Sequence, residues 1–251
     1  MKDLGEYKNL IFGTRAVMEA IHAGKEIEVV FVQQEARAPL LTELRKLLKE
    51  KAIPSKQVPK PLFNRYRNEN HQGVVASISA VQYTKLDWLL PQLYEKGQVP
   101  FFLILDKVTD VRNFGAICRS ASCFGVHAVI IPAKGSALIN EFAVKSSAGA
   151  LNHLDVCRVH SLMNTMEYLK DSGVSIIAIS EKGEKNYSEL VYDKPLALVM
   201  GAEDLGISKT LLGASDEVVK IPMQGPIESL NVSVAAGIVL SQAHQSRSRE
   251  A

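Results

Sequence analysis

The sequence contains little cysteine, and its cysteines are not arranged for metal binding or redox chemistry. Cys118, Cys123 and Cys157 form no C-x-x-C pair and leave an odd number. We therefore expect buried free thiols in a reducing cytosol, and hence a cytoplasmic protein. The six histidines show no H-x-x-x-H spacing, so the sequence predicts no metal site.

Long apolar runs are also missing, which argues against a membrane-spanning protein. No stretch reaches the roughly 20 residues of a transmembrane helix, and the first ten residues, MKDLGEYKNL, lack the apolar core of a signal peptide. A G-x-G-x-x-G run is absent too, which argues against a dinucleotide-binding oxidoreductase. With 47% hydrophobic and 22% charged residues, the 251-residue chain has the composition of a globular protein with one or two domains.

Positive charge is concentrated in one part of the chain. The net charge is only +2, but residues 1–80 hold 13 Lys and Arg against 9 Asp and Glu, whereas residues 98–251 hold 14 against 16. The densest basic stretch, residues 37–67, predicts a phosphate-binding surface, with Phe63 and Tyr66 as candidate stacking groups. A solvated helix face is the alternative. The residues selected for nucleic-acid contact are Arg37, Arg45, Lys46, Arg65 and Arg67.

Apolar periodicity and turn residues predict two α/β units joined by a connector. In the first unit we expect helices at residues 15–23 and 39–50 and strands at residues 28–32 and 73–78. The connector is residues 81–97, partly helical at 86–96. The second unit has predicted strands at 101–105, 127–131, 174–179, 196–200 and 217–221, and helices at 114–124, 140–149, 161–171 and 230–245. This alternation favours a parallel sheet with helices on both faces.

Three segments of the second unit place polar residues directly after an apolar strand. They are residues 105–132, 196–207 and 221–240. Ligands of parallel α/β sheets bind outside the carboxyl ends of the strands, so these segments are expected to converge on one site.

Each of these segments carries a distinct polar pattern. In the first, Asn113 is expected at a helix start, with Arg119 about one and a half turns further on. In the second, Glu203 lies between two glycines. In the third, Ser229 and Asn231 both precede a run of small apolar residues, and one helix cap needs only one of them.

Together the three segments resemble the signature motifs of the SpoU (TrmH) family of RNA ribose 2′-O-methyltransferases, which belongs to the SPOUT superfamily. The match covers most of residues 101–245. The residues that carry it, at family spacing, are Asn113, Arg119, Glu203, Ser229 and Asn231. One position departs from the pattern, because Val111 stands where many relatives carry proline. This change alters the stiffness of the loop rather than its chemistry.

The resemblance implies an α/β fold in two domains. We expect a small L30e-like RNA substrate-binding domain at residues 1–80, a linker at 81–97, and a SpoU methyltransferase domain at 98–251 with a parallel sheet and a deep trefoil knot. The turn His71-Gln72-Gly73 before the last N-terminal strand is similar to the turn in that domain. The knot follows from the resemblance alone, since periodicity does not reveal one.

The resemblance also implies the reaction, the transfer of a methyl group from S-adenosyl-L-methionine to a ribose 2′-hydroxyl. The cofactor is expected at Met200, Gly201, Ile221, Met223, Leu230 and Asn231, although a methionine is more often part of a core than of a cofactor site. The implied catalytic residues are Arg119, Asn113, Glu203, Ser229 and Asn231.

Arg119 has the central place in that set. Because a guanidinium stays protonated in proteins, we expect Arg119 to act as an electrostatic clamp on phosphate and developing alkoxide rather than as a base. A surface salt bridge to Asp106 or Asp110 is its alternative role. The two asparagines would orient the ribose or Arg119, Glu203 would fix Arg119 or its loop, and Ser229 has a plain N-cap as its alternative. Lys107 and Arg112, which flank the first motif, are further candidates for contact with RNA phosphates, and a solvated side chain is the alternative for each.

The two-domain arrangement is similar to that of enzymes that methylate a guanosine ribose of 23S ribosomal RNA. The resemblance therefore implies this RNA as the substrate. A transfer-RNA methyltransferase is the alternative, and a non-catalytic RNA-binding protein is a third reading that the presence of every motif disfavours. Family members are typically homodimers, so a homodimer is expected. The apolar helix at 232–243 is a candidate for its interface and equally a candidate for the core.

Overall fold

The computed structural model describes residues 7, 9–34, 36, 40–51, 53–226 and 229–247. The chain forms two compact units, Met1–Gln82 with Leu138–Glu141, and Tyr83–Ala137 with Phe142–Ala251. The domain limits expected from the sequence, 80/81 and 97/98, stay a prediction. In the described ranges, no helix combines the length and the apolarity that crossing a membrane requires.

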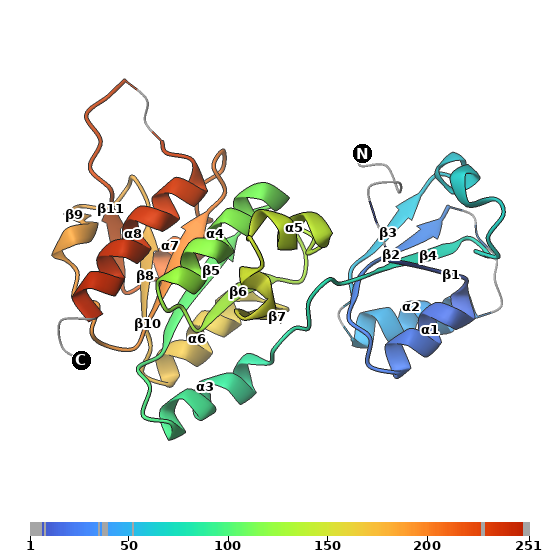
Figure 1. Cartoon of the computed structure of the whole chain (residues 1–251), viewed down its shortest axis with the longest axis horizontal. Coiled ribbons are helices and arrows are strands. Elements are labelled where there is room, and N and C mark those ends of the chain that lie inside the picture. Colours follow the sequence, from blue (N-terminus) through green and yellow to red (C-terminus); the bar gives the residue numbers. More distant parts are fainter. Residues whose placement is uncertain are drawn as a thin grey trace. The chain divides into compact units, whose positions relative to one another are not determined.

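The first unit is a four-stranded mixed sheet in the order β1-β4-β2-β3 (Figure 1). Strand β4 is antiparallel to β1 and β2, whereas β2 and β3 are parallel. The elements are β1 (Leu10–Phe12), α1 (Thr14–His22), β2 (Ile27–Gln33), α2 (Leu41–Glu50), β3 (Ser55–Val58), a 3₁₀ segment (Lys60–Tyr66) and β4 (Val74–Ile78).

Both faces of this small sheet are covered. Val30 and Val32 of β2 pack with α1 and α2, whereas Val29 and Phe31 pack on the other face with Phe63 of the 3₁₀ segment. The alternation follows from the two-residue period of a strand. Strand β2 is buried on both sides for this reason.

The second unit is a seven-stranded sheet in the order β7-β6-β5-β10-β8-β11-β9, and every pairing in it is parallel. Its strands are β5 (Phe101–Asp106), β6 (Ala128–Pro132), β7 (Asp155–Val159), β8 (Ser175–Ile179), β9 (Lys185–Asn186), β10 (Leu196–Gly201) and β11 (Glu217–Lys220). Its helices are α3 (Leu86–Glu95), α4 (Val111–Cys123), α5 (Glu141–Ser146), α6 (Leu162–Asp171), α7 (Lys209–Ala214) and α8 (Val232–Arg247).

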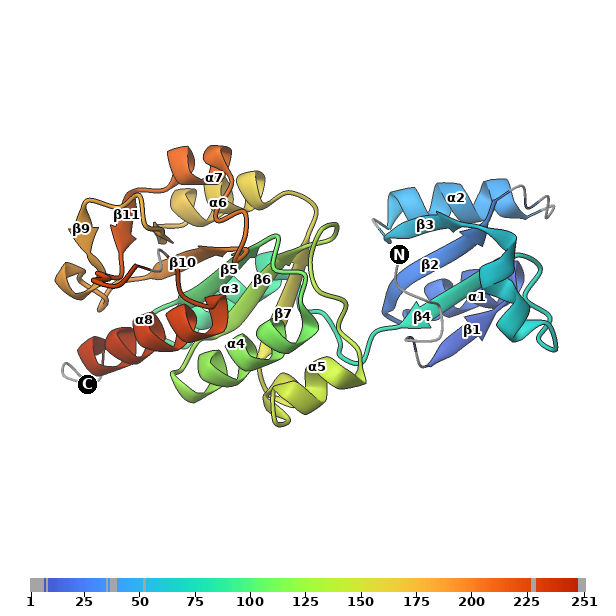
Figure 2. The same cartoon turned by 90° about the horizontal axis from the view of Figure 1, so that it is seen from above.

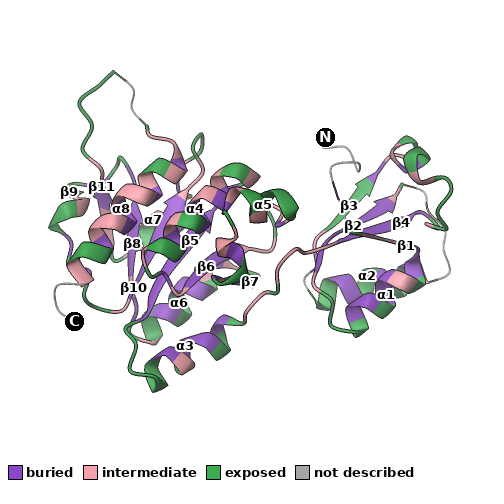
Figure 3. Cartoon of the chain, in the orientation of Figure 1, coloured by how far each residue is buried: buried purple, intermediate pink, exposed green. Residues whose placement is uncertain are grey.

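Helices cover the two faces of this sheet in separate groups. Helices α3, α6 and α7 pack on one face in a single apolar cluster. Helices α4 and α8 lie side by side on the other face (Figure 2). Strand β5 is therefore buried along its whole length and β10 up to Met200 (Figure 3), and both sequences show nearly continuous apolar runs rather than alternating ones.

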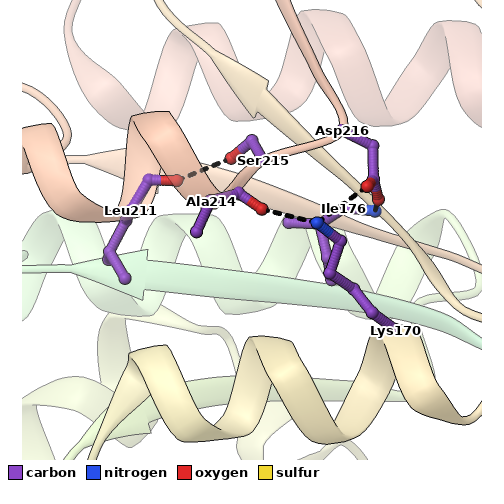
Figure 4. Close-up of polar contacts among 6 residues, drawn as sticks. All are labelled: Lys170, Ile176, Leu211, Ala214, Ser215 and Asp216. Atoms are coloured by element: carbon purple, nitrogen blue, oxygen red, sulfur yellow. Dashed lines mark hydrogen bonds and ion pairs between the residues drawn. The ribbon is translucent and has the colours of Figure 1, made fainter.

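The turn between α7 and β11 is tied to its neighbours by polar contacts (Figure 4). The Nζ of Lys170 donates to the carbonyl oxygen of Ala214 at 2.8 Å and pairs with Asp216 Oδ1 at 2.8 Å. The other oxygen of that carboxylate accepts the backbone N–H of Ile176 at 2.7 Å. These bonds fix where β11 begins beside β8.

The end of the last helix is held in a similar way. The guanidinium of Arg247 donates to the carbonyl oxygens of Tyr192, Lys194 and Val99, at 2.6, 3.0 and 2.6 Å. It also lies 4.9 Å from the centre of the Phe101 ring. Because α8 carries the third motif at its start, this anchor at its end helps to set where that motif lies.

Candidate active site

Four neighbouring strands end at one edge of the second sheet and send their loops to the same place. The chain runs outward from β5 through β6 to β7 and then crosses to β8 on the other side, so the direction of winding reverses between β5 and β8, where β10 lies. A switch point of this kind is where open α/β sheets bind ligands. The three segments picked from the sequence follow β5, β10 and β11, and they converge there.

The first segment starts its helix earlier than the sequence predicts. Helix α4 begins at Val111 rather than at 114, because the Asp110 side chain caps it by accepting the N–H groups of Arg112 and Asn113 at 2.8 and 2.9 Å. Asn113 therefore lies inside the first turn rather than at the cap. This frees its side chain for a contact outside the helix.

The second segment is a tight turn that depends on Gly201. A Cβ at Gly201 would lie 2.1 Å from the carbonyl carbon of Gly206 and 2.2 Å from the nitrogen of Ile207. Ala202 and Gly206 are bridged across the turn, with the Gly206 N–H donating to the Ala202 carbonyl at 2.8 Å. The turn holds Glu203 at its tip.

Asp106 joins this turn to the first segment. Its carboxylate is buried at the end of β5 and accepts the backbone N–H of Ser208 at 2.8 Å. Because Asp106 lies beside Gly201 in the β5–β10 pair, the loops after the two strands are held together.

In the third segment, the helix cap is Asn231. Its Oδ1 accepts from the backbone N–H and the hydroxyl of Ser233, at 2.9 and 2.6 Å. Ser229 is exposed, lies three residues before the helix start, and caps nothing in the described part of the chain. The plain N-cap alternative for Ser229 is therefore wrong.

The three segments meet in one hydrogen-bonded cluster. The Nδ2 of Asn231 donates to Asn113 Oδ1 at 3.1 Å and to Glu203 Oε2 at 3.2 Å. Because the amide oxygen of Asn231 must face the Ser233 donors, its nitrogen must face the other two side chains, so the orientation of this amide is determined. The Nδ2 of Asn113 has no partner among the described residues and is available to a ligand.

A pocket of about 350 Å³ lies beside this cluster, between the ends of β8, β10 and β11 and the start of α8. We call it the β10–α8 pocket. It is lined by Ile179, Ser180, Glu181, Met200, Gly201, Ala202, Glu203, Asp204, Leu205, Gly206, Ile207, Ile221, Met223, Ser229, Leu230, Val232 and Ala235. Five of the six residues expected at a cofactor are in this set. The sixth, Asn231, stands between Leu230 and Val232.

All the charged side chains that line this pocket are negative. Glu181, Glu203 and Asp204 all reach it, and no lysine or arginine is among its lining residues. Carboxylates in a cleft that also contains apolar side chains favour a ligand that carries positive charge. Glu181 and Asp204 were not selected from the sequence, although Glu181 follows a predicted strand.

A second pocket, of about 320 Å³, adjoins the first. We call it the β5–α4 pocket. It is lined by Lys107, Val108, Thr109, Asp110, Asn113, Ala202, Glu203, Asp204 and Val232. The last four of these residues also line the β10–α8 pocket, so the two pockets share a wall. Asn113 and Glu203, two members of the cluster, line the β5–α4 pocket.

Arg119 lies outside both pockets and outside the cluster. It is exposed on α4, on the same stripe as Arg112, and about 9 Å along the helix from Asn113. The alternative role as a salt bridge to Asp106 or Asp110 is not realised, because those carboxylates accept backbone N–H groups and Arg119 has no ion pair among the described residues.

The basic residues of the first unit are divided between two elements. Arg45 and Lys46 are exposed on α2, where Lys46 lies 3.9 Å from Glu50. Arg65 and Arg67 lie at the end of the 3₁₀ segment, which covers the opposite face of the sheet. The predicted single surface is therefore two groups, and Arg37 lies outside the described residues.

The two aromatic side chains expected to stack on bases are occupied within the fold. Phe63 is only 2% exposed and packs against His71, with ring centres 4.9 Å apart. Tyr66 is half-buried against Phe12, at 5.2 Å. The sequence showed them among basic residues but could not show that the sheet needs an apolar cover on this face.

The cysteines only partly match the expectation of buried thiols. Cys118 and Cys157 are buried, and Cys123 is exposed on α4. Burial raises the pKa of both inner thiols, that of Cys157 to about 12 with a further contribution from Asp155. Neither buried thiol is a nucleophile at neutral pH.

The sequence matches two known family models. The sequence model of the SpoU rRNA Methylase family matches residues 100–241, and that of the RNA 2′-O ribose methyltransferase substrate-binding domain matches residues 10–84. These two matches cover most of the chain, in the order expected from the motifs.

Individual relatives are similar to this chain over nearly its whole length. A putative TrmH family tRNA/rRNA methyltransferase of Bacillus subtilis is 30% identical over 97% of this chain and 98% of its own. A putative TrmH family tRNA/rRNA methyltransferase of Staphylococcus aureus is 36% identical over 95% of this chain and 96% of its own. The crystal structure of the SpoU methyltransferase AviRb from Streptomyces viridochromogenes, in complex with the cofactor AdoMet, shares the fold at a TM-score of 0.61, with 24% identity over 96% of this chain and 90% of that one.

Proposed function

This chain belongs to the SpoU family of RNA ribose 2′-O-methyltransferases, and from that premise we propose that it methylates a guanosine ribose of 23S ribosomal RNA, using S-adenosylmethionine. The observation that carries the reaction is the Asn113–Asn231–Glu203 cluster, which stands where two adjoining pockets meet. The observation that favours ribosomal RNA is the N-terminal unit, whose match is to a substrate-binding domain.

The β10–α8 pocket fits the proposed cofactor. S-adenosylmethionine combines an adenine ring, whose flat faces pack against apolar side chains, with a positively charged sulfonium, and the pocket combines Met200, Ile221 and Leu230 with three carboxylates. The streptomycete relative was solved in complex with AdoMet, which supports the same assignment here. Gly201, Met223 and Asn231 complete the proposed cofactor set. Gly201 keeps the turn close enough for backbone groups to reach the ligand.

The cofactor supplies an already electrophilic methyl group, so the protein has to position the acceptor and handle its proton. In this proposal, the fixed amide of Asn231 orients Asn113, whose free Nδ2 then donates to the ribose. Glu203 holds Asn231 from the other side and so serves as a positioning residue. Ser229, exposed at the pocket, offers its hydroxyl to the ligand. Alignment of this kind contributes roughly 7–11 kcal/mol in well-oriented reactions.

Arg119 and Arg112 are proposed as phosphate-binding groups on the exposed stripe of α4. They are seven residues apart, about two helical turns, and neither has an ion-pair partner among the described residues. Arg119 is proposed to clamp a substrate phosphate and to stabilise the developing alkoxide, since its guanidinium stays charged, and the clamped phosphate is proposed to accept the proton of the 2′-hydroxyl. In the first unit, Arg37, Arg45, Lys46, Arg65 and Arg67 are proposed to bind the RNA backbone.

We also propose a homodimer, because α8 keeps an apolar surface away from its own core. Val232, Ala236 and Val239 are buried, yet Val234 is 51% exposed and Ile238 is half-exposed on the outer side. A helix that is apolar all round is usually buried all round. A second copy of the chain is the proposed cover.

Methyl transfer to two RNA preparations tests the substrate. The full chain is incubated with tritiated S-adenosylmethionine and either unmodified 23S ribosomal RNA or bulk transfer RNA. Label in the ribosomal RNA alone supports the proposal. Label in transfer RNA alone would support the second candidate, which the tRNA/rRNA naming of the Bacillus and Staphylococcus relatives keeps open. Absence of label in both would contradict both assignments.

A further inference from the structure

Residues 138–141 belong to the first compact unit, although the chain on both sides of them belongs to the second. The chain therefore passes between the two units after Gln82, after Ala137 and after Glu141. The family models divide the sequence differently, because this segment falls inside the range matched to the SpoU rRNA Methylase family. We call residues 137–146 the strap, since its middle is part of one unit and both its ends are part of the other.

The middle of the strap is built into the first unit through buried groups. Ile139 has no exposed surface, and its N–H donates to Glu28 Oε1 at 2.8 Å. Its carbonyl oxygen accepts the N–H of Ala80 at 3.1 Å, and Leu138 packs against the apolar cluster that contains Phe31. Glu28 is only 4% exposed. Because a buried carboxylate is costly unless it is hydrogen-bonded, Glu28 is suited to holding this main-chain segment in place.

Both ends of the strap are attached to the first motif segment of the second unit. At one end, the Ala137 N–H donates to the carbonyl oxygen of Val108 at 2.8 Å, and both residues are buried. At the other end, Ser146 packs so closely on Gly115 that a Cβ on this glycine would overlap the serine hydroxyl. Val108 lines the β5–α4 pocket, and Gly115 comes two residues after Asn113.

A displacement of the strap therefore reaches the loop after β5 directly. The loop carries Asp110, which caps α4 and so sets the position of Asn113. The proposed chemistry needs the Asn113 amide where it meets Asn231, at 3.1 Å. Reactions that depend on alignment are sensitive to shifts of about 1 Å, even when the shift originates far from the reacting atoms.

We propose that the strap makes the geometry of the loop after β5 depend on the first unit, and that Glu28 is a positioning residue for methyl transfer. The inference rests on the proposed function and deepens it, because it gives the first unit a part in shaping the site in addition to binding RNA. Glu28 lines neither of the two pockets described above and acts through Ile139, Ala137 and Val108.

Four full-length variants separate this role from the stability of the first unit. Glu28→Ala removes the acceptor of the Ile139 N–H, whereas Glu28→Gln keeps an oxygen that accepts it. Ile139→Ala loosens the strap from its own side and carries the same test if Glu28→Ala does not fold. Val17→Ala is the matched control, because Val17 is fully buried in the same unit but packs in the cluster on the other face of the sheet from Leu138.

Amide hydrogen exchange, without RNA or cofactor, tests the strap itself. The reporters are the N–H groups of Ala137 and Phe114, which donate to the carbonyl oxygens of Val108 and Asp110. In Glu28→Ala both should exchange about tenfold faster or more, because the loop after β5 opens more often once the strap is released. Ile139→Ala should have the same effect.

The controls show whether the faster exchange comes from the strap. In Glu28→Gln and Val17→Ala, exchange of both reporters should stay within about twofold of the wild type. Unchanged exchange in both Glu28→Ala and Ile139→Ala would overturn the proposal. An equal acceleration in Val17→Ala would overturn it as well, since any loosening of the first unit would then have the same effect.

Single-turnover methyl transfer to unmodified 23S ribosomal RNA tests the role in the reaction. At saturating RNA and S-adenosylmethionine, Glu28→Ala should lower the rate about tenfold or more, keep cofactor affinity within about twofold, and be rescued by Glu28→Gln. A purely structural role in the first unit would weaken RNA binding and leave the saturated rate unchanged, as expected for Val17→Ala. A normal saturated rate in Glu28→Ala would exclude Glu28 as a positioning residue.

The exchange measurement needs no RNA, so it separates this inference from the proposed function. If the wild-type chain transfers no methyl group to the RNA and Glu28→Ala still accelerates exchange at Phe114, the reaction is wrong and the strap stands. If the wild-type chain methylates the RNA and the exchange does not change, the reaction stands and the strap is wrong.

Discussion

Asn231 illustrates how one side chain can serve folding and the proposed chemistry at once. Its oxygen begins α8 by capping it, and its nitrogen joins the first and second motif segments. The excess of polar residues before that helix was visible in the sequence, and it predicted a role beyond capping. Which of Ser229 and Asn231 forms the cap depended on the exact start of the helix, and the sequence left that open.

Among the predicted site residues, Arg119 is the one whose observed position differs most from the position expected from the sequence. Motif spacing placed it with Asn113, but the period of the helix turns it onto the exposed side of α4, away from the cluster. Phe63 differs for another reason, since it fills the core under the first sheet. Neither position could be inferred without knowing which face each segment buries.

For Arg119→Ala, we expect the rate of methyl transfer to fall by a factor of roughly a hundred or more, because the proposed electrostatic clamp on the substrate phosphate is lost. Affinity for S-adenosylmethionine should stay within about twofold, since Arg119 lies outside the β10–α8 pocket. Single-turnover kinetics and cofactor titration measure the two effects. Arg119→Lys is the control that keeps the charge. A near-normal rate in Arg119→Ala would exclude the clamp.

Thiol reactivity gives a second check at the scale of single residues. Burial holds the pKa of Cys118 and Cys157 above the ordinary range, so both stay protonated and unreactive at neutral pH, whereas Cys123 is exposed. Titration of the native protein with a disulfide reagent should label one thiol, and Cys123→Ser should abolish that labelling. Rapid reaction of two or three thiols would mean that the core around α4 and β7 opens readily.

Among the elements, the turn after β10 depends most on a single residue type. Gly201 allows the chain to fold back on itself within van der Waals distance of Gly206 and Ile207. The position needs glycine for space, because a Cβ there would overlap the backbone itself rather than a movable side chain. The carboxylates of Glu203 and Asp204 are presented to both pockets as a result.

Gly201→Ala should therefore displace the turn, weaken S-adenosylmethionine binding at least about tenfold, and lower the free energy of unfolding by roughly 2 kcal/mol or more. Gly213→Ala is the matched control. A Cβ at Gly213 meets nothing within 4 Å, and alanine in α7 should raise the free energy of unfolding by about 0.5–1 kcal/mol. Calorimetric cofactor titration and chemical denaturation measure both. Equal behaviour of the two variants would contradict the role given to the turn.

The long apolar elements and the short strand β11 were predictable, whereas the edge strands β7 and β9 and the short helix α7 were not. The central strands β5, β8 and β10 and the helices α6 and α8 lie within two residues of their predicted ends, because their apolar runs have no competing reading. Strand β9 has two residues and forms only by pairing with β11. Helix α7 is six residues long and is held by α6 through tertiary contacts that no local pattern encodes.

At the scale of the whole molecule, the two units divide the work that the family assigns to substrate binding and to catalysis. Each has its own apolar core, and the matched family models divide the chain in the same order. The all-parallel sheet followed from the alternation of strands and helices. The mixed pairing of the first sheet did not, because β1 and β3 are short and polar or half-buried. The trefoil knot and the homodimer remain predictions.

Charge removal on the two basic groups of the first unit tests which of them meets RNA. We expect Arg65→Ser with Arg67→Ser to weaken binding of 23S ribosomal RNA more than Arg45→Ser with Lys46→Ser, because Glu43 and Glu50 on α2 offset part of its charge. Filter binding at two salt concentrations measures this. Cofactor affinity, a property of the other unit, is the internal control. Equal losses in both pairs would contradict this ranking.

The central claim is methyl transfer to a ribose 2′-oxygen, and the most direct measurement is the position of the transferred label. Unmodified 23S ribosomal RNA is incubated with the full chain and tritiated S-adenosylmethionine, and the product is then hydrolysed in alkali. A 2′-O-methyl group blocks cleavage of the next phosphodiester, so the account predicts label in an alkali-resistant dinucleotide that begins with guanosine. Label recovered in ordinary mononucleotides would place the methyl group on a base and would contradict the account.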